Sequence, residues 1–179
     1  QCFGLNEALH GVARAGKATV FPQAIGLAAT FDNQAVYETF DIVSDEARAK
    51  YHDFQRKGER DGYKGLTFWT PNINIYRDPR WGRGMETYGE DPYLTSLMGL
   101  AVVKGLQGGG TGKYDKAHAC AKHYAVHSGP EWNRHSFDAK NIFQRDLWET
   151  YLPAFKTLVK EGKVKEVMCA YNRFEGEPC

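Results

Sequence analysis

The chain has 179 residues, of which 42% are hydrophobic and 25% are charged, a composition typical of a globular domain with a packed core. Its 23 Lys and Arg residues nearly balance 22 Asp and Glu residues, and this formal net charge of +1 argues against a nucleic-acid binder. No apolar run approaches the roughly 20 residues of a membrane span, and no signal-peptide pattern opens the chain. We therefore expect neither nucleic acid nor a membrane as a partner, and the compartment stays open.

Three helices are predicted in chain order. Residues 35–57 carry apolar side chains at three-and-four spacing after a capping residue at Asp32 or Asn33. A second helix begins at residues 91–92, an aspartate cap followed by proline, and ends at the glycine run 108–110. A third apolar stripe spans residues 147–159, with its main part beginning at Pro153 because proline is poorly tolerated inside a helix.

A buried strand is predicted after each of these helices, at residues 66–69, 117–126 and 167–171. Alternating strands and helices without tight hairpin turns imply parallel strands joined by crossover helices. Polar residues gather after each strand, as they do at the C-terminal face of a β/α barrel. A doubly wound sheet is the alternative, but its Gly-x-Gly-x-x-Gly phosphate turn is missing.

Four cysteines, Cys2, Cys120, Cys169 and Cys179, are too far apart for a zinc ribbon or a C-x-x-C redox motif. Cys120 and Cys169 lie in apolar, strand-like runs, and buried free thiols behave as small hydrophobic residues. We expect Cys120 and Cys169 in the core, whereas the sequence leaves the role of Cys2 and Cys179, near the two ends of the chain, undecided.

The loop after the first strand, within residues 68–92, combines arginines with the aromatic residues Trp81 and Tyr88. Guanidinium groups bind oxygens with fixed geometry and aromatic rings cover apolar faces, so this mixture suits a sugar. The alternative is a surface turn in which Asp78 pairs with an arginine.

A metal site is a rival interpretation, because His123, His127, Glu131 and His135 recur every four residues. The Ser-Gly-Pro sequence at 128–130 interrupts any continuous helix there, so we expect no metal. Adjacent strand residues point to opposite faces, so Lys122 and His123 can share one ligand only if the backbone between them is unusual, as with a cis peptide.

Five motifs in this order resemble the first domain of glycoside hydrolase family 3, the β-glucosidases and β-xylosidases. They are residues 6–11 (NEALHG), 77–83 (RDPRWGR), 89–92 (GEDP), 121–124 (AKHY) and 168–172 (MCAYN). The resemblance implies an α/β fold, a partial TIM (β/α)8 barrel, and retaining hydrolysis of β-linked sugars from the non-reducing end. It implies no cofactor, a periplasmic or extracellular parent enzyme, and an oligosaccharide or aryl glycoside as substrate.

The same resemblance assigns six substrate-binding residues. Glu7 matches a carboxylate that is aspartate in typical glucosidases of the family. The others are Arg83, Lys122, His123, Met168 and Tyr171, with the lysine-histidine pair sharing a cis peptide in the family and Tyr171 placed near the nucleophile.

The nucleophile is expected beyond Cys179, as is the acid/base carboxylate, so this chain holds no catalytic residue. A complete barrel needs about 250 residues, so we expect residues 1–179 to be one incomplete barrel segment, without the downstream strands and second domain. The isolated segment is then inactive and able to self-associate through its open sheet edge. Glu7 favours xylosides over glucosides. A non-catalytic carbohydrate-binding module is the alternative function, although such modules are more often β-sandwiches.

Overall fold

The computed structural model describes residues 5–110 and 112–179, so Cys2 lies outside the described residues. Its main sheet has three parallel strands in the order β1, β2, β4. These strands are Thr67–Phe68, His118–Tyr124 and Glu166–Cys169. Asn6 adds a parallel bridge to Phe68 at the β1 edge, so a fourth segment continues the sheet. The parallel strands confirm the predicted α/β class.

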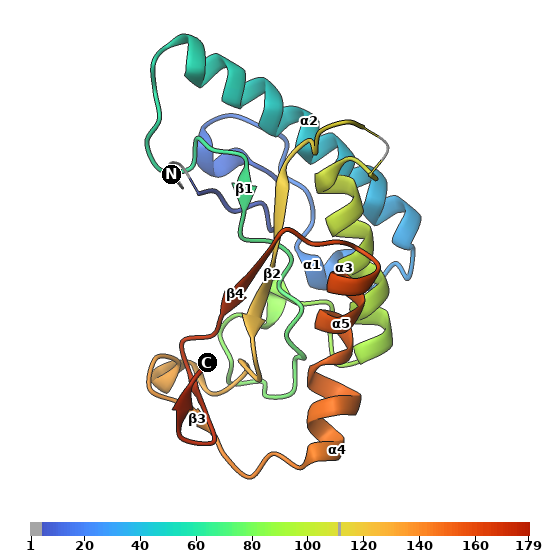
Figure 1. Ribbon diagram of the computed structural model, residues 1–179, viewed down its shortest axis with the longest axis vertical. Helices are drawn as coiled ribbons and strands as arrows, with labels where there is room; N and C mark the ends of the chain where they lie inside the picture. Colours follow the sequence, from blue (N-terminus) through green and yellow to red (C-terminus); the bar gives the residue numbers. More distant parts are fainter. Residues whose placement is uncertain (1–4, 111) are drawn as a thin grey trace.

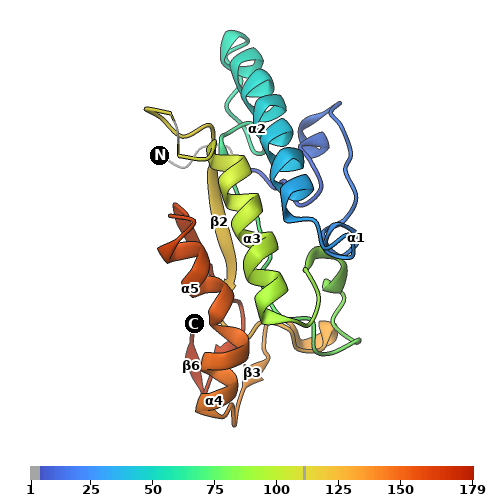
Figure 2. The ribbon, with the colours of Figure 1, turned by 90° about the vertical axis from the view of Figure 1, so that its right-hand side faces the viewer.

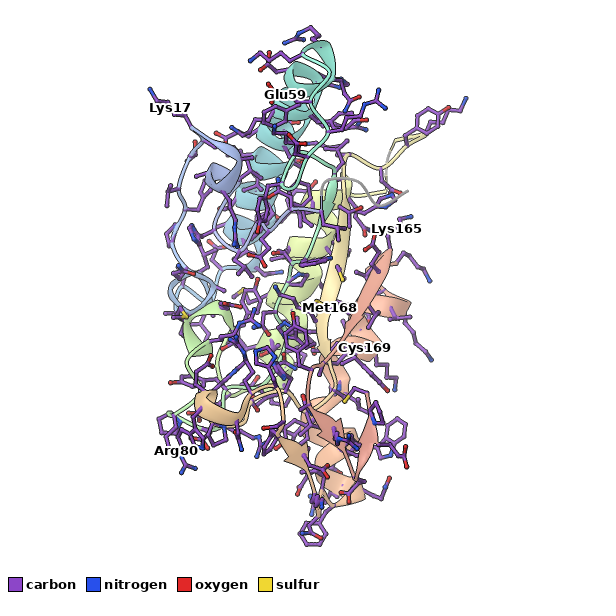
Figure 3. All side chains as sticks on the ribbon, turned by 90° about the vertical axis from the view of Figure 1, so that its left-hand side faces the viewer. Lys17, Glu59, Arg80, Lys165, Met168 and Cys169 are labelled. Carbon is purple, nitrogen blue, oxygen red and sulfur yellow. The ribbon has the colours of Figure 1, made fainter. Side chains whose placement is uncertain are left out.

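Three helices cover one face of this sheet, as Figures 1 and 2 show. They are α2 (Asn33–Arg56), α3 (Pro92–Gln107) and α5 (Pro153–Lys160). Helix α3 packs between α2 and α5 against β2. None of these three helices lies on the opposite face, which is the face turned toward the viewer in Figure 3.

Shorter elements connect these layers. The helical ones are η1 (Ala13–Ala15), α1 (Ala24–Ala28), η2 (Gly84–Glu86), η3 (Glu131–Asn133), α4 (Gln144–Asp146) and the π-helical turn η4 (Leu147–Tyr151). A second small sheet has the order β3-β5-β6, formed by Asp138–Ala139, Arg173–Phe174 and Glu177–Pro178. None of the helices in the described part of the chain has both the length and the apolar character to cross a membrane.

Local sequence sets the ends of the two longest helices. The Asp32 side chain accepts a hydrogen bond from Ala35 N, and the Asp91 side chain accepts one from Leu94 N. Each bond satisfies an amide that the first helical turn leaves free. At the other end of α3, Gly108 adopts a left-handed φ of 84° that favours glycine. These are the helix boundaries that the sequence predicted.

The main core lies between the helices and the sheet, where Phe40 of α2, Leu106 of α3 and Phe68 of β1 are buried. Helices α2 and α3 approach closely at Gly105. A Cβ at this position would lie only 2.6 Å from the Tyr37 carbonyl oxygen, so only glycine fits there. This contact fixes the two helices against each other.

Strand β4 is an edge of the main sheet, and its side chains alternate between half-buried and exposed. Cys169 is therefore exposed, and its predicted place in the core was wrong, whereas Cys120 on the central strand is buried as predicted. Beside this edge lies an apolar groove of about 520 Å³. Its lining includes Trp148, Val159 and Val167, all of which are exposed.

Candidate functional site

Two adjacent residues at the C-terminal end of β2, Lys122 and His123, anchor the site. Both are about 1% exposed, and the peptide bond between them is cis, as the sequence predicted. The register between β2 and β4 shifts between Lys122 and Tyr124. His123 Nε2 lies 3.1 Å from Arg83 Nη1, and the charge of Arg83 also acts on Lys122.

Arg83 reaches this pair from the loop after β1. Its Nη1 lies 3.1 Å from His123 Nε2, and its Nε and Nη2 donate to the two Glu86 carboxylate oxygens at 2.9 and 2.5 Å. Asn72 Nδ2 also donates to Glu86, at 3.2 Å. Burial opposes ionisation of Glu86, but the hydrogen bonds and charge of Arg83 outweigh it, so the pKa of Glu86 is lowered. The carboxylate thus holds the guanidinium in one orientation.

Lys122 is a buried cation without a partner. No hydrogen bond or ion pair joins its Nζ to another residue in the ranges 5–110 and 112–179. Burial and the neighbouring Arg83 charge lower the pKa of Lys122 to about 8, although Glu7 and Glu86 act in the opposite direction. An ammonium group in this state is available to bind the oxygen of a ligand.

His123 is held on its other side by Asn74, which lies in the extended segment before the loop. Asn74 Oδ1 lies 2.9 Å from both His123 N and His123 Nδ1, and Asn74 Nδ2 donates to the His123 carbonyl oxygen at 2.9 Å. Burial and the Arg83 charge hold the pKa of His123 well below its usual range. The imidazole is therefore neutral near pH 7.

A second histidine packs on the first. The rings of His123 and His127 lie 4.6 Å apart, and His127 Nδ1 is 2.8 Å from Asn172 Oδ1. Burial lowers the pKa of His127, although its hydrogen bond to Asn172 acts against that shift. Tyr171 lies beside both rings, with centroid distances of 6.4 Å to His123 and 6.1 Å to His127, and it also contacts His135 at 5.0 Å.

The two remaining predicted residues lie nearby. Met168 on β4 is the register partner of Lys122, and Figure 3 labels it near the middle of the face opposite α2, α3 and α5. Glu7 influences the pKa of Lys122 but forms its ion pair with Arg14. The structure thus brings Arg83 and Tyr171 to His123, which is adjacent to Lys122, and leaves Glu7 paired with Arg14.

Trp81 and Tyr88 do not present open faces to a ligand, and the expectation that they would was wrong. Each is only 2% exposed. Tyr88 belongs to the main core, and Trp81 packs edge-on against His127. The loop's exposed aromatic contact is made instead by Trp132, with the Arg80 guanidinium 5.6 Å from its ring centroid.

Other residues of the same loop form hydrogen bonds within the loop or to the neighbouring loop. Asp78 accepts hydrogen bonds from Arg80 N, Nε and Nη2, and these bonds lower the pKa of Asp78 to about 2. Arg77 Nε donates to Ser128 Oγ at 3.0 Å, which ties the loop to the one after β2. Around residues 123–135 the chain forms a strand end, a turn and η3, and not the continuous helix that a histidine stripe would need. Within the described ranges, no group of three or more His, Cys, Asp or Glu side chains could hold a metal ion.

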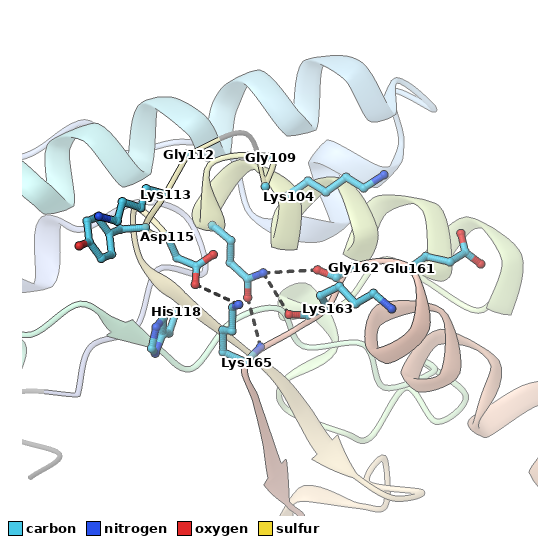
Figure 4. A pocket seen from close by; sticks show the side chains of 13 residues that line it. Lys104, Gly109, Gly112, Lys113, Asp115, His118, Glu161, Gly162, Lys163 and Lys165 are labelled. Atoms are coloured by element: carbon cyan, nitrogen blue, oxygen red, sulfur yellow. Dashed lines mark hydrogen bonds and ion pairs between the residues drawn. The ribbon is translucent and has the colours of Figure 1, made fainter.

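A separate cavity of about 710 Å³ lies at the opposite end of the strands, near the start of β2 at His118 and just before β4 at Lys165. Figure 4 shows Lys104, Lys163 and Lys165 around it, with Lys165 paired to Asp115 at 3.0 Å. None of the predicted substrate-binding residues lines this cavity. Its size alone does not make it the site, because parallel β/α folds place their chemistry at the C-terminal ends of the strands.

The arrangement at the end of β2 can bind hydroxyl groups from several directions. Arg83 and Lys122 supply donors, and the neutral His123 supplies an acceptor. The sequence analysis did not identify Asn74 as a residue of the site. The pattern that could have indicated it is the alternation of Asn72 and Asn74 with Ile73 and Ile75, because an asparagine that is buried beside isoleucines must have hydrogen-bond partners.

Residues 4–179 match the family described as "Glycosyl hydrolase family 3 N terminal domain". The chain is 57% identical to a xylan 1,4-beta-xylosidase of Xylanibacter ruminicola over 99% of its own length and 21% of that protein. It is 46% identical to beta-D-xylosidase 1 of Arabidopsis thaliana, over 97% of the chain and 23% of that protein. The chain thus spans about a fifth of the length of these relatives.

Solved structures of similar proteins agree with this family match. A GH3 exo-beta-xylosidase in complex with a xylobiose aziridine activity-based probe superposes with a TM-score of 0.84 at 38% identity, over 97% of this chain and 23% of that one. A beta-glucosidase from Listeria innocua in complex with glucose gives a TM-score of 0.76 at 30% identity, over 97% and 22%. The fold is therefore that of a partial (β/α)8 barrel, and the strands of the described residues do not close.

Proposed function

Because the chain belongs to glycosyl hydrolase family 3 through its N-terminal domain, we propose that the protein carrying it is a retaining, exo-acting β-glycosidase. Its substrates are β-xylosides or β-glucosides, as oligosaccharides or aryl glycosides, cleaved at the non-reducing end. This segment contributes the sugar-binding subsite. The named activities of its relatives, xylan 1,4-beta-xylosidase and beta-D-xylosidase 1, support this class of reaction.

One observation carries the proposal: the buried cluster of Arg83, Lys122 and His123 at the end of β2. A buried ammonium without a partner is costly unless a ligand supplies one. Sugar hydroxyls have the required lone pairs and can also donate to His123. Charges held around one ring favour a distorted, oxocarbenium-like transition state over the ground state.

Bond cleavage is proposed to need residues outside the chain. A retaining glycosidase uses two carboxylates about 5 Å apart, one as nucleophile and one as acid/base. Neither is assigned within residues 1–179, so the segment alone should not turn over substrate. The apolar groove beside β4 and α5 is where we expect the next strand and helix of the barrel to pack, because an exposed parallel edge with apolar neighbours is incomplete.

We favour xylosides over glucosides. Glu7 has one more methylene than aspartate and would reach further into the space that a glucose hydroxymethyl group requires. The first-named relatives are xylosidases, which supports the same preference.

The test compares nitrophenyl β-xyloside with nitrophenyl β-glucoside on the full-length protein. We expect hydrolysis of both with a higher kcat/KM for the xyloside, and retention of anomeric configuration. A clear glucoside preference would contradict the preference for xylosides but leave the proposed β-glycosidase activity standing. Absence of any β-glycoside hydrolysis, together with sugar binding by the 179-residue chain, would favour the carbohydrate-binding module instead.

A further inference from the structure

Asn74 stands out as a buried polar residue that touches the site without facing a ligand. It lies in the extended segment between Ile73 and Ile75, both of which are buried, and it is 4% exposed itself. All of its side-chain hydrogen bonds to another segment go to a single residue, His123 on β2.

Two backbone groups fix which way the Asn74 amide points. The His123 N–H can only donate, so the atom 2.9 Å from it must be the acceptor Oδ1. The His123 carbonyl oxygen can only accept, so the atom 2.9 Å from it must be the donor Nδ2. The orientation of this amide is thus determined by the chain itself.

That orientation decides the tautomer of the His123 ring. Nδ1 lies 2.9 Å from Oδ1 of Asn74, so it must carry the proton and donate. A neutral imidazole has one protonated nitrogen, which leaves Nε2 with its lone pair. Arg83 gives independent support, because a guanidinium only donates and its Nη1 lies 3.1 Å from Nε2.

We propose that Asn74 is a positioning residue that holds His123 in the Nδ1–H tautomer, so that Nε2 is presented as a hydrogen-bond acceptor. In the structure Arg83 donates to this acceptor. When a sugar binds, one of its hydroxyl groups donates to Nε2. The inference deepens the proposed function by stating which partner in that hydrogen bond supplies the proton.

The surroundings keep the ring neutral. Burial is the main cause, and the charges of the neighbouring groups Arg83, Lys122, His127 and Arg134 also disfavour an imidazolium. Glu86 reaches this ring only through Arg83. Asn172 holds His127 through the same kind of Nδ1 contact, so the two neighbouring rings share one arrangement.

Neutron diffraction from deuterium-exchanged crystals of the full-length protein near pH 7 tests the tautomer directly. We expect nuclear density for deuterium on His123 Nδ1 and none on Nε2. Deuterium on Nε2 overturns the inference. This readout does not depend on activity, so it separates a failure of the inference from a failure of the proposed glycosidase function.

The pH profile of Asn74→Asp tests the same point in solution. A carboxylate beside Nδ1 stabilises the imidazolium and raises the pKa of His123, so Nε2 becomes protonated as pH falls. We expect the loss of kcat/KM on acidification to begin at a higher pH in this variant than in wild type.

Asn33→Asp is the matched control, because Asn33 is exposed in the first turn of α2 and lies outside the site. It should leave the wild-type profile unchanged. Asn74→Ala should lower kcat/KM without adding an acidic limb. An Asn74→Asp profile parallel to that of wild type would overturn the inference, and the neutron result decides the matter if Asn74→Asp does not fold.

Discussion

Arg83 and Glu86 form a bidentate ion pair one helical turn apart, with both side chains largely buried at 15% and 16% exposure. Planar pairing of this kind restricts the guanidinium to one plane. The free face of Arg83 is then directed at His123, where we propose the sugar binds.

Glu86→Gln should therefore weaken both the site and the fold. We expect a loss of about 1–3 kcal/mol in the free energy of unfolding, because a buried cation loses its counter-charge. In the full-length protein kcat/KM should drop at least tenfold. Glu149→Gln, which breaks the exposed Arg145–Glu149 pair, is the control and should cost at most about 1 kcal/mol. Equal effects of the two variants would contradict this role.

The pH dependence of the same pair has a definite sign. The pKa of Glu86 is lowered below its ordinary value of 4.5, so its stabilising effect is fully present above pH 4.5. The effect is lost as pH falls through the lowered pKa. Acid unfolding of wild type and Glu86→Gln should therefore converge at low pH, as followed by circular dichroism.

Lys122→Met should raise the free energy of unfolding while removing a proposed sugar-binding group. Between about pH 8 and 10.5 the unfolded chain binds more protons than the folded one, so wild-type stability rises across this window. The variant lacks this dependence and should be more stable by roughly 1–3 kcal/mol below pH 8. Chemical denaturation at pH 6, 8 and 10 measures the difference. A less stable variant at pH 6 would show that Lys122 has a stabilising partner.

Glu7→Asp should shift specificity in the full-length protein. The shorter side chain leaves room for a hydroxymethyl group, so the ratio of kcat/KM for xyloside over glucoside should fall on the order of tenfold. The ion pair with Arg14 is exposed enough that its loss should matter little to folding. An unchanged ratio would show that specificity lies elsewhere.

The isolated 179-residue chain should self-associate through the β4 edge and its apolar groove. Light scattering should give a mass that rises with concentration. Val167→Lys places a charge on the exposed edge strand and should reduce this association, as edge lysines do in natural sheets. Lys113→Met, at the other end of the sheet, is a control that should leave it unchanged. A strictly monomeric wild-type chain would contradict the expectation.

Sequence predicted most accurately what depends on local chemistry. Asp32, Asp91 and Gly108 act within one helical turn, so the residue types alone indicated where helices begin and end. The parallel sheet followed from the alternation of elements. The cis peptide between Lys122 and His123 was expected from the family resemblance, and because adjacent strand residues can face one ligand only where the backbone between them is unusual.

Which side chains of the loop after β1 are buried depends on partners that are far away in the sequence, so their burial could not be predicted from local residue types. Trp81 is buried because the chain after β2 brings His127 against it, and nothing near Trp81 in sequence signals that. Cys169 is exposed because β4 has no further neighbour among the described residues. Asn74 acts on a ring 49 residues away, so only the assembled sheet shows what it does.

The extended segment 72–75 has two sides with separate duties. Asn72 and Asn74 bond to Glu86 and His123, while Ile73 packs into the main core. In an extended chain these sides alternate residue by residue. Inserting or deleting one residue here would exchange the groups that position the site for core groups, while point substitutions can alter one side and spare the other. The geometry of the site and the packing of the core can therefore evolve independently within four residues, provided the length of the segment is kept.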